Sequence, residues 1–174
     1  DKKIVAERIE KAIARIIEED RKKSINNELT PEQKLIGEDF STNKGRLPWP
    51  VEKGIITNHF GVHRHPVLKY VTENNFGIEI TSAGKTAARS IFKGEVTAIT
   101  AISGANMTVI IKHGSYLSVY TNLVNVKVKK GDKVDTKQVI GEVYQDPSAN
   151  YNSTIKFMIF EKQYLDPELW IAKN

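Results

Sequence analysis

Asn75-Phe76-Gly77-Ile78-Glu79-Ile80 has the pattern of a β-strand that presents polar side chains four residues apart. In a segment of the form H-x-x-x-D, an imidazole and a carboxylate project toward one ion. They supply two of the roughly three protein ligands that a catalytic zinc site needs. Here the two positions hold Asn75 and Glu79. The segment therefore has the shape of a metal-binding strand and lacks part of its chemistry.

Further motifs surround this strand. In chain order they are Phe60-Gly61-Val62-His63-Arg64-His65-Pro66, Tyr120-Thr121-Asn122-Leu123, Gly131-Asp132-Lys133-Val134, Gln138-Val139-Ile140-Gly141 and Thr154-Ile155-Lys156-Phe157. Together with residues 75–79 they resemble the LytM/lysostaphin-type zinc endopeptidases of bacterial cell walls, over about residues 46 to 172. The resemblance implies a mainly β fold, in which antiparallel sheets of barrel-sandwich character follow N-terminal α-helices.

The catalytic positions of that family hold other residues here. By the resemblance, Asn75 stands at the first histidine ligand and Glu79 at the aspartate ligand. Thr154 and Lys156 replace the two histidines of H-x-H, and Asn122 replaces a histidine that helps to stabilise the transition state. The ammonium of Lys156 has only donors and offers no lone pair to a cation. We therefore expect no catalysis, no metal and no cofactor at these positions.

One branch of the family fits better, the degenerate LytM domains of EnvC-like murein hydrolase activators. The leading segment Asn43-Lys44-Gly45-Arg46-Leu47-Pro48-Trp49-Pro50-Val51 resembles that of this branch. The resemblance implies a non-catalytic activator of a peptidoglycan (N-acetylmuramoyl-L-alanine) amidase in cell-wall remodelling and cell separation. It also implies an upstream coiled coil linked to a membrane division complex, a location in the periplasm or cell envelope, and peptidoglycan itself as a second candidate ligand.

A groove that loses its zinc ligands remains a concave polar surface that can bind a peptide or a helix. We expect the partner-binding groove to be lined by Asn75, Glu79, Asn122, Thr154, Lys156, His63 and His65. The alternative is a groove that has no binding function, in which Lys156 and Glu79 form a buried ion pair. Removing one partner of such a pair would leave an uncompensated buried charge and destabilise the fold.

The histidines allow a second interpretation. His59, His63 and His65, with Glu79 downstream, could supply zinc ligands for an endopeptidase that uses a replacement site. Arg64 would bring a fixed positive charge near that ion, so histidines that face solvent or line the groove are the preferred interpretation. A third alternative is a peptidoglycan-binding module without an amidase partner.

Composition limits the function classes. The 174 residues include no cysteine, which excludes disulfides and thiolate metal sites. The net charge of +5 is not interleaved with aromatic residues, so nucleic acid is not an expected partner. The start has no signal-peptide pattern, and we expect a fragment whose export signal lies upstream.

Three segments follow from periodicity. Residues 1–29 form an amphipathic helical arm with an isoleucine stripe, residues 30–45 a short helix and linker, and residues 46–174 the β domain. The arm either caps the β core or continues a truncated coiled coil, or it lies over the groove as a restraining helix. In the short helix, Thr30, Pro31 and Gln33 have the pattern of a capping box.

Local patterns predict the finer features. The buried face of the short helix is expected to comprise Leu35, Ile36 and Phe40. Strands are expected at Val51 and at residues 55–57, 78–81, 88–92, 94–101, 107–113, 117–123, 139–143 and 153–161. The residues of the F-G-x-R-x-H-P type are expected to form a turn, and His113 is expected to hydrogen-bond the turn that directly follows it. Trp49 and Trp170 are expected to pack on the sheet.

Overall fold

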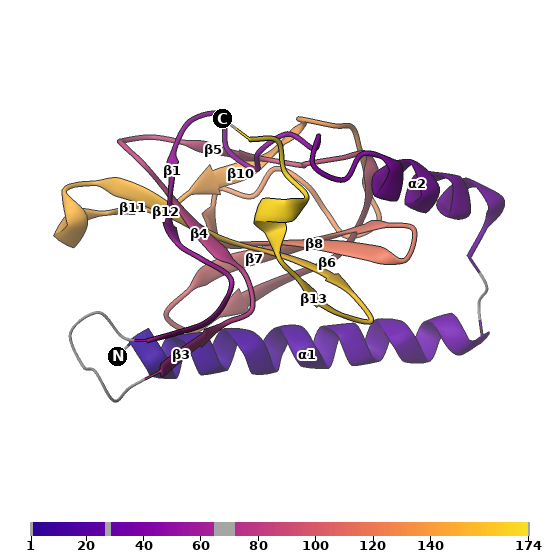
Figure 1. Ribbon diagram of the computed structural model, residues 1–174, viewed down its shortest axis with the longest axis horizontal. Coiled ribbons are helices and arrows are strands. Elements are labelled where there is room, and N and C mark those ends of the chain that lie inside the picture. Colours follow the sequence, from indigo (N-terminus) through magenta and orange to yellow (C-terminus); the bar gives the residue numbers. More distant parts are fainter. Residues whose placement is uncertain (1, 27–28, 65–71, 174) are drawn as a thin grey trace.

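Two helices precede a β-rich domain in this computed structural model, which describes residues 2–26, 29–64 and 72–173 (Figure 1). Helix α1 spans Lys2–Asn26 and α2 spans Pro31–Thr42. The long helix predicted from the isoleucine stripe is confirmed and extends to Asn26. Neither helix has the length and hydrophobicity of a membrane-spanning segment.

The N-terminus of α2 is a capping box, as predicted. The Thr30 hydroxyl accepts a hydrogen bond from the Gln33 backbone N–H at 3.1 Å, and the Gln33 side chain accepts one from the Thr30 N–H at 3.0 Å. The predicted buried face is wrong at Leu35, which is 57% exposed, while Phe40 is fully buried. Phe40 provides the contact of α2 with the core, because its ring stacks on those of His113 and Trp170 at centroid distances of 4.8 and 5.3 Å.

The β domain is one curled antiparallel sheet with an additional hairpin. The sheet contains 11 strands in the described residues, with a path β1-β4-β12-β8-β7-β6-β9, and β2 pairs only with β3. The strands are β1 Ile55–Asn58, β2 Gly61–Arg64, β3 Thr72–Asn75, β4 Ile78–Ser82, β5 Ala87–Arg89, β6 Gly94–Ile102, β7 Asn106–His113, β8 Tyr116–Val124, β9 Lys133–Val134, β10 Val139–Val143, β11 Gln145–Asp146, β12 Asn152–Glu161 and β13 Gln163–Leu165. The predicted fold class, mainly antiparallel β with N-terminal helices, is confirmed.

Three strand predictions need correction. The segment expected to form a turn contains β2, which pairs with β3 from Gly61 opposite Asn75 to Arg64 opposite Thr72. Val51 is buried but lies outside any strand, and β5 ends at Arg89 rather than at Phe92. These segments are short, and their packing and pairing in the fold determine their conformation more than local propensity does.

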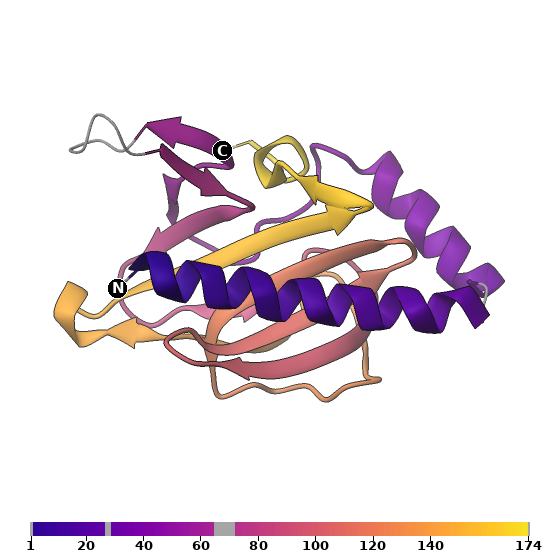
Figure 2. The ribbon, with the colours of Figure 1, turned by 90° about the horizontal axis from the view of Figure 1, so that it is seen from below.

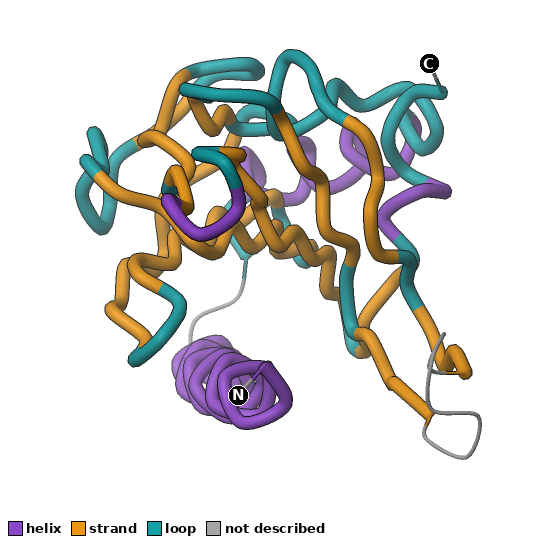
Figure 3. Tube along the Cα trace, turned by 90° about the vertical axis from the view of Figure 1, so that its left-hand side faces the viewer, coloured by secondary structure: helices purple, strands orange, loops and turns teal. Residues whose placement is uncertain are grey.

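Two apolar clusters lie on opposite faces of the sheet. The larger one, the main core, is lined by residues that include Val51, Ile78, Ile80, Val109, Tyr120, Leu123, Ile155, Phe157 and Trp170. The smaller one, the helix-facing core, joins Ile9, Ile13 and Ile17 of α1 to Ile102, Ala105, Ile110, Leu117, Val119 and Met158. Helix α1 crosses the strands on this face in Figure 2 and lies beneath the sheet in the end-on view of Figure 3.

His113 is a neutral structural residue of the main core region. It is fully buried, with Nδ1 2.8 Å from the Lys93 carbonyl oxygen and Nε2 2.7 Å from the Ser118 hydroxyl. Burial lowers the pKa of His113 to about 4, because desolvation disfavours the imidazolium. The structural role predicted for His113 is present, but its backbone hydrogen bond joins Lys93 before β6 and not the turn that follows His113.

Both tryptophans pack as the sequence predicted. Trp170 is buried, and the Trp49 indole N–H donates to the Ala172 carbonyl oxygen at 2.7 Å. These contacts tie the segment that leads into the sheet to the last residues of the chain.

Candidate functional site

The alternation of β12 places the candidate site on the face that α1 covers. Ile155 and Phe157 belong to the main core, whereas Met158 belongs to the helix-facing core. Thr154 and Lys156 are an even number of residues from Met158, so their side chains lie on its face of the sheet. The two predicted positions on β12 therefore point toward the α1 side.

Glu79 lies on the same face, because its neighbours Ile78 and Ile80 are buried in the main core. Glu79 is directly opposite Lys156 in the β4–β12 pair, and Lys156 is opposite Thr121 in the β12–β8 pair. Both Glu79 and Lys156 are only partly buried, and the contacts of the described residues include no ion pair between them. The alternative of a buried Lys156–Glu79 pair is therefore wrong.

A row of hydroxyl groups crosses the floor beside these residues. The hydroxyls of Thr57 and Thr81 are 2.9 Å apart, and those of Thr81 and Thr154 are also 2.9 Å apart. Each hydroxyl can both donate and accept, so the row offers adaptable hydrogen bonding to a ligand. Sequence reasoning missed Thr81, although its place two residues after Glu79 puts it on the same strand face.

Asn122 joins the site at the end of β8. Its side-chain amide donates to the Thr154 carbonyl oxygen at 2.8 Å, and its side-chain oxygen accepts from the Asn106 amide at 2.8 Å. Asn122 has φ of 78°, a conformation that asparagine tolerates better than most residues, and the β7–β8 pairing shifts its register beside it. Asn122 therefore lies beside Thr154 and also shapes the strand end.

Asn75 closes the other end of the site. Its side-chain amide donates to the Asn58 side-chain oxygen at 2.9 Å and to the His59 carbonyl oxygen at 3.0 Å. Asn58 is paired with Glu79 between β1 and β4. Four positions of the inherited metal centre thus lie on the adjacent strands β4, β12 and β8, and Asn75 joins the β2–β3 hairpin to β1 beside them.

The histidines lie at the edge of this row. His63 Nε2 is 3.1 Å from the His59 carbonyl oxygen, which Asn75 also contacts, and 2.9 Å from the Phe60 carbonyl oxygen. Since carbonyls only accept, this nitrogen carries a proton and has no lone pair for a metal. His59 Nδ1 is 2.7 Å from a Glu168 carboxylate oxygen. His65 lies outside the described residues.

The residues of the inherited centre do not fit zinc. Zinc in proteins takes thiolate, imidazole and carboxylate ligands, and Glu79 alone among the replaced ligand positions supplies one of these. Asn75 uses its amide as a donor, and Lys156 brings a positive charge to the centre. The described residues contain no group of three or more His, Cys, Asp or Glu side chains placed to hold a metal.

Helix α1 brings its own charge over this floor. The pKa of Glu10 is raised mainly by burial, while the nearby positive charge of Lys156 partly opposes that shift. Tyr164 of β13, which packs against the helix-facing core, has its pKa raised to about 12 by burial and by the negative charge of Glu10. Glu10 therefore lies within electrostatic range of Lys156, so α1 lies near the β12 side of the candidate site, whereas Thr57 at the β1 side is exposed.

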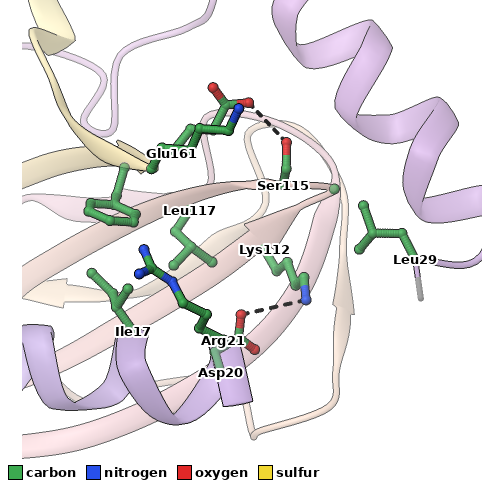
Figure 4. A pocket seen from close by; sticks show the side chains of 11 residues that line it. Ile17, Asp20, Arg21, Leu29, Lys112, Ser115, Leu117 and Glu161 are labelled. Atoms are coloured by element: carbon green, nitrogen blue, oxygen red, sulfur yellow. Dashed lines mark hydrogen bonds and ion pairs between the residues drawn. The ribbon is translucent and has the colours of Figure 1, made fainter. Parts of the chain in front are cut away.

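Polar contacts hold α1 near both ends of its apolar stripe. The Arg8 guanidinium donates to the Ser103 hydroxyl at 3.4 Å in the β6–β7 turn. A carboxylate oxygen of Asp20 lies 3.6 Å from the Lys112 ammonium (Figure 4), and its other oxygen accepts from the Thr97 hydroxyl at 3.5 Å. These contacts determine where α1 lies along the sheet. The sequence could not identify them, because the partners are far apart in the chain.

The antiparallel sheet and the N-terminal helices form a LytM-type fold. The sequence profile of Peptidase family M23 matches residues 73–167, which is more than half of the chain. The chain therefore belongs to peptidase family M23. No curated protein is similar enough to count as a match.

Solved structures of the same fold include proteins of several kinds. The chain is similar to a structure of the SpoIIQ–SpoIIIAH pore-forming complex, with a TM-score of 0.60 and 19% identity over 75% of this chain and 93% of the other. It is similar to Csd3 of Helicobacter pylori, with a TM-score of 0.62 and 24% identity over 75% of this chain and 36% of Csd3. It is also similar to a zinc-containing peptidase from Vibrio cholerae, with a TM-score of 0.60 and 21% identity over 75% of this chain and 41% of the peptidase. At these identities the likeness establishes the fold alone.

Proposed function

We propose that the chain is a non-catalytic activator of a peptidoglycan amidase, and that the amidase binds the groove floor that α1 covers. One observation supports the proposal: Glu79, Thr154 and Lys156 lie on one sheet face, with Asn75 and Asn122 hydrogen-bonded beside them, and only one of the ligand positions offers a zinc-binding group. What remains is a polar floor of hydroxyl, amide and charged groups beside apolar side chains. Such a surface suits recognition of a peptide or helix.

The cover supplied by α1 supports a restraining role. Ile13 is fully buried, and Ile9 and Ile17 are nearly so, against Ile110 and Val119 of the sheet. A partner can contact the apolar part of this face only after α1 leaves. Removal of α1 would expose the same apolar surface to water, which favours replacement by another apolar face. The apolar surface beside the polar row would therefore suit a partner once α1 has left it.

Activation would follow from selective binding. The amidase conformation whose active site is open would be the one that fits the uncovered groove, so binding would shift the amidase population toward it. We place this event in the periplasm or cell envelope, with an upstream coiled coil linked to a membrane division complex supplying the signal that moves α1. Peptidoglycan itself is a second candidate ligand of the groove.

The test is activation of a purified peptidoglycan amidase on dye-labelled sacculi. Ile13→Asp puts a charge into the helix-facing core and should release α1, so activation should rise well above that of the unaltered chain. The matched control is Ala14→Asp, because Ala14 is exposed on the same helix. It should leave activation low.

The groove is tested in the released background. Lys156→Glu combined with Ile13→Asp should abolish most of the gain, whereas the exposed Lys53→Glu should preserve it. Unchanged activation by the Lys156 variant would contradict binding through this floor. Binding to sacculi without effect on any amidase would support a peptidoglycan-binding module, and zinc-dependent cleavage of cross-link peptides would support an endopeptidase.

A further inference from the structure

A pocket lies at the C-terminal half of α1, away from the row described above. Its volume is about 400 Å³, which is within the range of small-molecule sites. Ile17 and Arg21 of α1 form one wall, and Leu117 and Phe160 of the sheet form part of the other. Figure 4 shows the Arg21 side chain extending beside Ile17 toward Leu117.

The carboxylates of this pocket already have partners. Asp20 pairs with Lys112, and a Glu161 oxygen accepts a hydrogen bond from the Ser115 hydroxyl at 3.0 Å (Figure 4). The cations are in excess, because Arg21 and Lys162 have no hydrogen-bond or ion-pair partner among the described residues. The lining holds three cations, Arg21, Lys112 and Lys162, and two carboxylates, Asp20 and Glu161, so the pocket has a net positive charge beside an apolar surface.

A guanidinium is suited to a carboxylate, which it can bind through two parallel N–H···O bonds. Apolar walls exclude water and so strengthen such a contact relative to a fully solvated one. The side chains of Ile17, Leu117 and Phe160 in turn need an apolar body to fill the space between them. The chemistry thus favours a ligand that carries a single carboxylate on an apolar group.

We propose that this pocket binds a small hydrophobic carboxylate, of which an N-acylated apolar amino acid is the simplest form, and that binding holds α1 against the sheet. The lining residues come from both α1 and the sheet, so the complete pocket exists only while α1 is in place. A ligand that contacts both sides stabilises the covered state by mass action. This inference stands whether or not the groove binds an amidase.

The test uses the whole chain, labelled with ¹⁵N, and two probes that share one apolar body. N-acetyl-L-phenylalanine should give saturable shifts of the Gly114 and Ser115 amide signals, and N-acetyl-L-phenylalaninamide should bind about tenfold more weakly, since it lacks the charge. Arg21→Gln should remove the difference between the probes. Arg15→Gln, at an exposed position of α1 outside the pocket, should preserve it.

A second measurement tests the effect on α1. Saturating N-acetyl-L-phenylalanine should slow hydrogen exchange of α1 amides in the unaltered chain and not in the Arg21→Gln chain. Equal binding of the two probes, absence of saturable shifts, equal effects of the two arginine variants, or faster exchange of α1 would each overturn the proposal. None of these measurements involves an amidase, so the proposed function stands or falls separately.

Discussion

The carboxylate of Asp20 on α1 lies 3.6 Å from the ammonium of Lys112 on β7, with only 24% and 16% of the two side chains exposed. The Thr97 hydroxyl, 3.5 Å from the other carboxylate oxygen, adds a second directional contact. Apolar contacts alone tolerate sliding of a helix along a sheet, whereas a shielded ion pair specifies one position. Asp20 therefore fixes the place of α1 over the candidate site.

Asp20→Asn should weaken the attachment of α1 by about 1–2 kcal/mol, a value between those of exposed and fully buried pairs. Hydrogen exchange of α1 amides should accelerate, while exchange in β7 and β8 should stay unchanged. Glu18→Gln removes the same charge from an exposed position of the helix and serves as the control. Equal exchange in both variants would show that the pair does not hold α1.

Gly77→Ala should destabilise the β domain by about 2 kcal/mol or more, because a Cβ atom there would overlap the Phe157 carbonyl oxygen and the Met158 side chain. This close approach explains the glycine in the motif at residues 75–79. Gly84→Ala is the comparison, since its Cβ would meet nothing and it incurs only the strain of a positive φ, about 1 kcal/mol. Urea unfolding of the two variants should rank them in this order, and the reverse order would refute the steric argument.

His113 should make the domain sensitive to acid. Its pKa is about 4 in the folded state, below the ordinary value of 6.5, so the folded state binds fewer protons than the unfolded state. The contribution of His113 to the free energy of unfolding is complete above about pH 6.5. It declines as the pH falls toward 4, by about 3 kcal/mol in total. Urea unfolding between pH 7.5 and 4.5 should show a steeper loss for the unaltered chain than for His113→Asn. Parallel losses would contradict the assignment.

The row of polar residues should regain a metal when the ligands are restored. Asn75→His, Glu79→Asp and Lys156→His, combined with Ile13→Asp to move α1 aside, should bind one equivalent of zinc by calorimetry. The same chain with Lys156 retained should bind zinc far more weakly, because an ammonium has no lone pair. Failure of the restored chain to bind zinc would show that these positions do not converge as the family geometry requires.

The sequence was most informative where local chemistry determines structure. Thr30, Pro31 and Gln33 predicted the start of α2 correctly, because a capping box satisfies its own backbone groups within one turn. The prediction that Leu35 lies on the buried face of α2 was wrong. Periodicity shows which residues share a helix face, but the width of the face that is covered depends on the neighbour, here Phe40 against His113 and Trp170.

The site was predictable only in part. The motif at residues 75–79 and the pair Thr154 and Lys156 identified a common sheet face, since alternation and strand order follow from the family resemblance. The contacts of Glu10 and Asp20 could not be predicted. The isoleucine stripe of α1 predicts that one helix face is buried, but it does not indicate which surface it packs against. The sheet face against which α1 packs depends on the tertiary structure of residues 46–174.

The separation of the two apolar clusters has a thermodynamic consequence. Since the main core does not include α1, the free energy that folds the sheet and the free energy that docks the helix are largely independent quantities. Substitutions at the α1 interface can then adjust the resting fraction of uncovered molecules, tenfold for each 1.4 kcal/mol or so, while the β domain stays folded. The threshold for response is thus a property that selection can adjust without redesigning the domain.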